Sequence, residues 1–217
     1  MLARTQWQNL NTKLSLIVLK RKITLNKHPH INLLSNVKMM RNLKTCYLKP
    51  LRLMMSRKVS AQDVKRNASF APVRIMAGAL GNGLPKRDLL VSRQHRMLVS
   101  SRISARMFGK ADVLVAAIRL TELPGVFVEP DHGAVEYFHL LFDKHEVIYA
   151  EGAPSESFYL GAEALKSLTP DARAEVALLF PHVFETTARH PAARPIPSGP
   201  QQKTLIARHS KNKKAYP

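Results

Sequence analysis

Two pairs of residues in this 217-residue chain combine groups that can move protons. Ser92 and His95 are three residues apart in a predicted tight turn after a buried strand, which can direct a hydroxyl and an imidazole at one point. Asp143 and His145 follow an alternating apolar strand, and a carboxylate two residues from a histidine can orient its tautomer. Such groups suit polarising a carbonyl or protonating an amide nitrogen as it leaves. Each pair by itself is also common in ordinary turns.

The apolar strand that ends at Phe142 is predicted to have two different faces. Side chains alternate across a pleated strand, so Phe138 and Leu140 share a face with Phe142, and Tyr137 and His139 lie on the other. We expect one face to pack in the core and the other to carry chemistry or polar structure.

Short apolar runs separated by turn residues predict a mainly β protein rather than alternating helices and parallel strands. Two glycines and a proline predict a turn at 81–85. The other predicted strands lie at 50–55, 72–77, 88–91, 97–99, 113–118 and 126–128.

Two helices are predicted from their end signals. Ser60 followed by Asp63 resembles a capping box and predicts a helix start. Near the other end of the chain, Thr169 is a predicted cap, Pro170 occupies the first turn, and Pro181 ends the helix.

Positive charge is concentrated in the first third of the chain. Residues 1–75 contain 16 Lys and Arg against the single acid Asp63, whereas residues 76–217 contain 18 against 14 acids. The first glycine is Gly78, although tight β turns usually recruit glycine. We expect residues 1–49 to form a divergent basic segment that is poorly structured, a basic binding arm, or an aberrant half-domain.

The chain is predicted to divide into that segment, a β domain at 50–185 and a tail at 186–217. Prolines lie at 191, 195, 197 and 200, and a basic cluster lies at 211–214. This composition predicts a transition from ordered to disordered chain at about residue 190.

No segment is long and apolar enough for a membrane span or a cleaved signal peptide, because the longest early apolar run is 16–19. The default compartment is therefore the cytoplasm, with secretion by another route left open. The single cysteine, Cys46, excludes an internal disulfide and a cysteine-based zinc site. No metal or cofactor is expected, and a site built from His132, His139 and His145 is a minor alternative.

The segment 72–157 resembles the bacterial branch of the Hint domains, the autoprocessing modules of hedgehog proteins and inteins. The resemblance rests on the sequence patterns at 73–81, 87–95 and 135–157, and it extends over roughly 50–180.

The resemblance implies a flat, horseshoe-shaped fold of short antiparallel strands with one or two small C-terminal helices. It also implies cleavage of the protein's own backbone, in which a Cys or Ser converts the preceding peptide bond into a thioester or ester. His95 matches the histidine that protonates the leaving amide, and Ser92 stands where the family usually has threonine. Asp143 and His145 match a late pair that assists proton movement. The substrate would be the protein's own polypeptide, and no cofactor is implied.

Departures from the family pattern limit the reaction that the resemblance implies. Cys46 and Ser15 are poor candidates for the nucleophile, Arg93 replaces a common proline, and the His-Asn pair of inteins is absent. These features predict N-terminal self-cleavage rather than splicing. An inactive structural or interaction module and a basic nucleic-acid-binding protein remain as alternatives, the latter disfavoured because aromatic residues do not alternate with basic ones. The sequence predicts no membrane partner and leaves the oligomeric state open.

Overall fold

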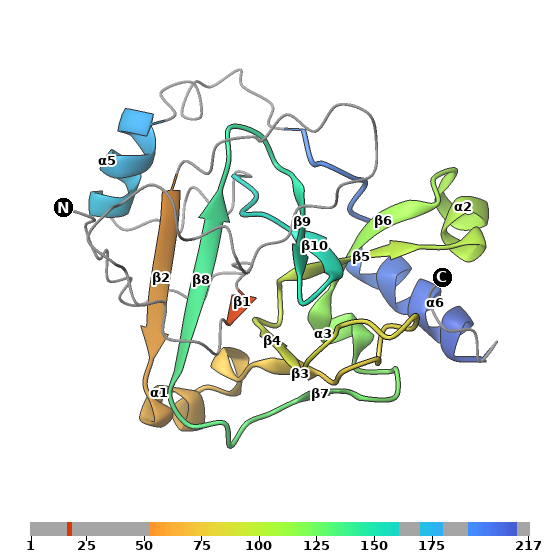
Figure 1. The fold of residues 1–217 in the computed structure, drawn as a ribbon, viewed down its shortest axis with the longest axis horizontal. Coiled ribbons are helices and arrows are strands. Elements are labelled where there is room, and N and C mark those ends of the chain that lie inside the picture. The colour runs from red at the N-terminus through yellow and green to blue at the C-terminus, as the bar shows by residue number, and fades with distance from the viewer. Residues whose placement is uncertain (1–16, 19–52, 161–169, 180–190, 212–217) are drawn as a thin grey trace.

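The computed structural model describes residues 17–18, 53–160, 170–179 and 191–211, whose strands form two antiparallel sheets (Figure 1). The six-stranded sheet has the order β2-β8-β1-β4-β3-β7, and the four-stranded sheet has the order β6-β5-β10-β9. The prediction of a mainly β fold with short antiparallel strands is therefore confirmed. The strands of the first sheet are β1 (Ile17–Val18), β2 (Leu53–Val59), β3 (Val73–Ile75), β4 (Leu89–Val91), β7 (Val126–Val128) and β8 (Val135–Leu141). Those of the second are β5 (Arg96–Ser100), β6 (Asp112–Ala116), β9 (Val147–Ala150) and β10 (Ala153–Glu156).

The described chain passes from the first sheet to the second at two connections. The first joins β4 to β5 through residues 92–95, and the second joins β8 to β9 through residues 142–146. Each connection carries one of the two proton-handling pairs that the sequence indicated. The fold therefore places both pairs at the boundary between the sheets.

A two-residue turn sets the register of the β9–β10 hairpin. Glu151 and Gly152 both have positive φ angles, 51° and 82°, which is the backbone of a type I′ turn and matches the twist of the strands it joins. Ala150 then pairs with Ala153, and at the open end Val147 pairs with Glu156.

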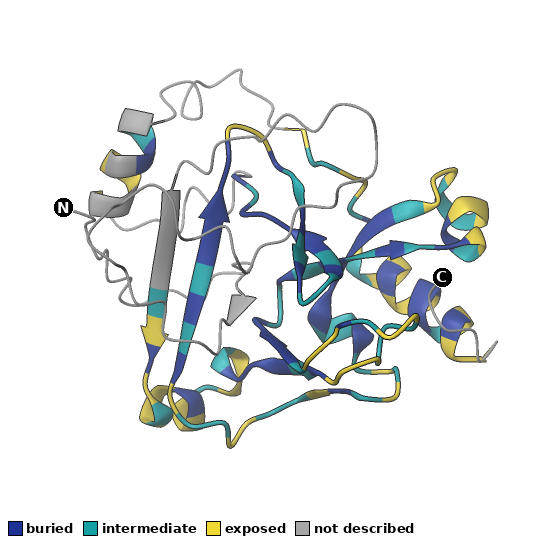
Figure 2. Cartoon of the chain, in the orientation of Figure 1, coloured by how far each residue is buried: buried dark blue, intermediate teal, exposed yellow. Residues whose placement is uncertain are grey.

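One apolar cluster joins the two sheets (Figure 2). Val73 and Val91 come from the first sheet and Val99 and Val115 from the second, and all four are almost inaccessible to solvent. All three residues of β4 are buried, as predicted for that strand. Burial of this apolar surface is the main stabilising contribution to a fold of this kind.

The helix start predicted at Ser60 is confirmed by α1 (Ala61–Arg66). The backbone N–H of Asp63 donates to Ser60 Oγ over 3.1 Å, and the Ser60 hydroxyl donates to the Asp63 carboxylate over 2.7 Å. A short 3-10 helix, η1 (Ala68–Phe70), follows.

Two short helices were not predicted: α2 (Arg102–Phe108) and α3 (Ala117–Leu120). The strand expected at 113–118 ends at Ala116, so its last two residues were wrongly assigned. The N–H groups of Ala117 and Ile118 donate to the carbonyls of His95 and Arg93. These contacts across the fold turn the chain out of the sheet, which a local pattern cannot reveal.

The described part of the C-terminal region contains the helices α5 (Pro170–Leu179) and α6 (Gly199–Lys211). The first confirms the predicted helix, while its expected cap Thr169 and stop Pro181 lie outside the described residues. For residues 191–211 the expected disorder is wrong. Leu205 and Ile206 of α6 are fully buried in the core cluster, and this packing stabilises a helix whose sequence is mostly polar.

The second face of β8 carries polar structure. Tyr137 and His139 are both buried, and the Tyr137 hydroxyl donates to the carbonyl of Phe70 over 2.7 Å. The His139 ring packs edge-on against Phe158 with 4.4 Å between ring centroids. Of the expected core residues, Leu140 and Phe142 are confirmed, whereas Phe138 is only half-buried.

Apart from β1, the N-terminal segment predicted at 1–49 lies outside the described residues, as do Cys46 and Ser15. In β1, Ile17 pairs with Val91 on one side and with Phe138 on the other. Within the described ranges, no helix has the length and apolar character needed to span a membrane.

Candidate functional site

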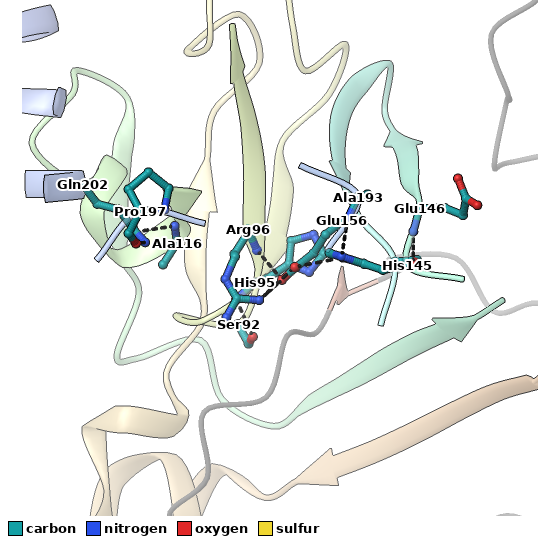
Figure 3. A network of polar contacts seen from close by, with 11 residues as sticks. Ser92, His95, Arg96, Ala116, His145, Glu146, Glu156, Ala193, Pro197 and Gln202 are labelled. Atoms are coloured by element: carbon teal, nitrogen blue, oxygen red, sulfur yellow. Dashed lines mark hydrogen bonds and ion pairs between the residues drawn. The ribbon is translucent and has the colours of Figure 1, made fainter. Parts of the chain in front are cut away.

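The turn from Ser92 to His95 is held by several hydrogen bonds (Figure 3). The backbone N–H of His95 lies 3.1 Å from the Ser92 carbonyl and 3.2 Å from Ser92 Oγ, so the serine side chain reinforces the turn. The His95 carbonyl accepts from the N–H of Ala117 over 2.8 Å. Both residues are buried, with His95 only 2% exposed.

Burial controls the protonation of His95. It lowers the pKa of His95 from the ordinary 6.5 to about 4, because the charged imidazolium loses its hydration. The carboxylate of Glu156 opposes this effect and raises the pKa, whereas Arg96 and His145 lower it. His95 is therefore a neutral imidazole at neutral pH. Its Nε2 atom is buried and has no hydrogen-bond partner among the residues that the structure describes.

Glu156 is the buried carboxylate of this site, and the sequence did not single it out. Ser155 pairs with Met97, which brings the next residue of β10 beside Arg96 at the start of β5. The backbone N–H of Arg96 donates to Glu156 Oε1 over 3.0 Å, and the Arg96 Nη1 lies 3.1 and 2.9 Å from the two carboxylate oxygens. The side chain of Glu156 is inaccessible to solvent. These charge-assisted bonds offset the cost of burying its charge.

His145 reaches the same carboxylate from the second connection. Its Nε2 lies 3.3 Å from Glu156 Oε2, close enough for an electrostatic contact but not aligned as a hydrogen bond. On the other side of the ring, the backbone N–H of Ala193 donates to Nδ1 over 3.0 Å. Because Nδ1 accepts this bond, the proton of a neutral His145 lies on Nε2, which faces Glu156.

The predicted residues occupy different environments. Ser92, His95 and His145 are buried, and both histidines interact with Glu156, so Figure 3 shows two distant segments meeting at one carboxylate. Asp143 is exposed in the turn before His145. Glu156 lies within the sequence pattern 135–157 noted above, but only the strand register places it opposite Arg96.

Two histidines of the alternative metal site, His132 and His139, contact different neighbours. His132 lies 3.1 Å from the Glu129 carboxylate, and His139 packs on Phe158. Among the described residues, no three His, Cys, Asp or Glu side chains are grouped so that they could hold a metal ion.

Comparison with protein families gives a match to the family described as Hint domain over residues 43–162, more than half of the chain. The chain belongs to the Hint domain family. The match includes Ser92, His95, His145 and Glu156, so the whole buried cluster lies in the Hint domain. Comparison with curated proteins and with solved structures gave no significant match.

The Hint domain match begins upstream of residue 50 and ends before α6. Cys46 lies within the matched stretch but outside the described residues. Residues 191–211 lie beyond the match, although Ala193 contacts His145.

Proposed function

We propose that this Hint domain protein cleaves its own backbone by an N-terminal acyl shift in which His95 carries the proton. The observation that supports this most is the buried, neutral imidazole of His95, whose Nε2 is without a protein partner in the described structure, close to the charge of Glu156. A buried titratable group with a strongly lowered pKa beside a charged partner is typical of functional sites.

The proposed first step begins with a hydroxyl or thiol whose oxygen or sulfur attacks the carbonyl carbon of the preceding peptide bond. His95 Nε2 takes the proton of the nucleophile and becomes an imidazolium. The carbon–nitrogen bond then breaks, and the imidazolium returns the proton to the departing amide nitrogen. The product is an ester or thioester, which water or an added thiol cleaves to release the upstream segment.

This order revises the expectation that His95 starts as a general acid. A histidine with a pKa of about 4 is unprotonated at neutral pH, so it has to accept a proton before it can donate one. Glu156 assists the first half of the cycle, because its negative charge favours the imidazolium form of His95.

Glu156 in turn is held by Arg96 and faced by His145. Arg96 fixes both carboxylate oxygens, and His145 presents its Nε2 to one of them. In this proposal Ser92 holds the turn that directs His95, and His145 orients the carboxylate. Cys46 and Ser15, which lie outside the described residues, are the candidates for the nucleophile to test.

The experiment fuses a reporter domain upstream of Met1 and follows the chain by mass spectrometry at neutral pH, with and without added dithiothreitol. We expect a shortened reporter fragment whose release increases with the thiol, and its mass identifies the cleaved bond. Cys46→Ala and Ser15→Ala variants then identify the nucleophile.

Two histidine variants provide the comparison. His95→Ala should abolish release, whereas His132→Ala, which changes a partly exposed histidine paired with Glu129, should leave it unchanged. Absence of any fragment from the folded fusion protein would favour a silent structural module. Equal cleavage in the His95→Ala variant would exclude His95 as the proton carrier.

A further inference from the structure

The segment 191–211 lies outside the part of the chain that matches the Hint family, yet one of its backbone groups contacts the candidate site. We propose that this segment positions His145 for the reaction through the backbone N–H of Ala193. The role in catalysis rests on the proposed function, whereas the effect on the His145 ring is independent of it.

The hydrogen bond from Ala193 requires one particular tautomer of the His145 imidazole. An N–H group can only donate, so Ala193 requires a lone pair on His145 Nδ1, 3.0 Å away. The ring proton is thereby confined to Nε2, the atom that lies 3.3 Å from Glu156 Oε2. Without the Ala193 donor, the tautomer with the proton on Nδ1 would also become accessible, and that tautomer presents a lone pair to the carboxylate, which is repulsive.

Strand β6 holds Ala193 in place. This strand is at the edge of the four-stranded sheet, and an edge leaves backbone groups without strand partners. The N–H of Leu114 donates to the Pro195 carbonyl over 2.9 Å, two residues after Ala193. Arg194 also contacts the carboxylate of Asp112 at the start of β6.

Gln202 makes a second connection to β6. Its Oε1 accepts from the N–H of Ala116 over 3.0 Å, and its Nε2 donates to the Pro197 carbonyl over 2.7 Å, as Figure 3 shows. The side chain is buried, so both bonds are protected from water. The glutamine thus ties the extended chain before α6 to the strand.

The helix anchors the whole segment. Leu205 and Ile206 are fully buried in the core cluster, and His209 Nε2 lies 3.0 Å from Ser101 Oγ at the cap of α2. The position of Ala193 therefore depends on core packing rather than on an isolated surface contact. Residues 43–162 alone would lack both the donor to His145 and the partners of the β6 edge.

The first test uses the unaltered full-length protein labelled with nitrogen-15. A hydrogen bond between two nitrogen atoms transmits a scalar coupling, so a cross peak is expected between the Ala193 amide nitrogen and His145 Nδ1. The ring shifts should report the tautomer with the proton on Nε2. Assigned signals without the coupling, or with the proton on Nδ1, would overturn the proposal.

The second test replaces the peptide bond between Ala192 and Ala193 with an ester by semisynthesis, which removes the N–H and keeps the chain shape. We expect the His145 nitrogen shifts to move toward a mixture of tautomers and reporter release to slow about tenfold, the factor for one lost hydrogen bond. Ala193→Gly, which keeps the N–H, serves as the control and should change neither the ring shifts nor reporter release.

The His145 ring shifts test the positioning role of Ala193, and reporter release tests self-cleavage. A folded ester variant with unchanged ring shifts would refute the positioning role, whatever the cleavage result. Altered ring shifts in a protein that never releases its reporter would support the role of Ala193 in fixing the His145 ring and refute self-cleavage.

Discussion

The Nε2 atom of His145 lies 3.3 Å from Oε2 of Glu156 at the open end of the β9–β10 hairpin. Arg96 approaches the same carboxylate from β5 with Nη1 only 2.9 Å from Oε2. One buried negative charge thus faces two groups from different segments, and it partly opposes the lowering of the His95 pKa by burial.

Neutralising Glu156 should destabilise the protein. Glu156→Gln keeps the side-chain shape but weakens the charge-assisted bonds from Arg96, for which we expect a loss of about 2 kcal/mol in the free energy of unfolding. Urea titration followed by circular dichroism measures this loss. Glu151→Gln removes a similar two-oxygen contact with Arg87, which is exposed, and should cost clearly less. Equal losses in both variants would contradict a special role for the buried pair.

His95 should make stability fall as the solution is acidified. Its pKa is 6.5 ordinarily and about 4 in the folded state, so between these values the unfolded chain binds a proton that the folded chain does not. The contribution of neutral His95 to the free energy of unfolding is fully present above pH 6.5. About 3 kcal/mol of it is lost when the pH has fallen to 4.

The measurement compares unfolding free energies of the wild type and His95→Gln from pH 7 to 4. Burial also lowers the pKa of His209, so the wild-type slope contains more than one histidine and the informative quantity is the difference between the two proteins. We expect the variant to have the flatter profile. Parallel profiles would show that His95 is not held neutral by the fold.

Gly125 should tolerate a methyl group less well than Gly133. Both have positive φ, 76° and 83°, so alanine strains either backbone by about 1 kcal/mol. An added Cβ at Gly125 would lie 3.0 Å from the Cβ of Ala79, whereas nothing lies within 4 Å at Gly133. We expect Gly125→Ala to cost about 1 kcal/mol more than Gly133→Ala in thermal unfolding. The same cost at both positions would argue against this close approach.

The Tyr137 hydroxyl should contribute to stability through its bond to the Phe70 carbonyl. Tyr137→Phe removes a buried donor, and a loss of about 1 kcal/mol is expected. Tyr149→Phe, on a half-buried residue of β9, is the matched control. Urea unfolding of the two variants tests the difference, and no extra loss at Tyr137 would show that water replaces the bond.

Features that depend on neighbouring residues were predictable from the sequence. Ser60 and Asp63 are three residues apart, so their capping bonds form within one helical turn. The strand β4 and the turn of Ser92 and His95 were also found, because an apolar run followed by turn residues is a local signal. Helix α2 also has local end signals in its sequence, Ser101 as the cap at its start and Gly109 at its end.

The sequence determined the residue types able to move protons, the strands before them and the likeness to the Hint family. Tertiary structure alone decided that Glu156 lies beside Arg96, 60 positions away, because strand register is a property of paired segments. It also decided that residues 191–211 are ordered, since Leu205 and Ile206 are buried in a core cluster formed by residues far from them in the sequence. Local patterns report the conformation of a segment, whereas burial and charge pairing depend on what the rest of the chain brings to it.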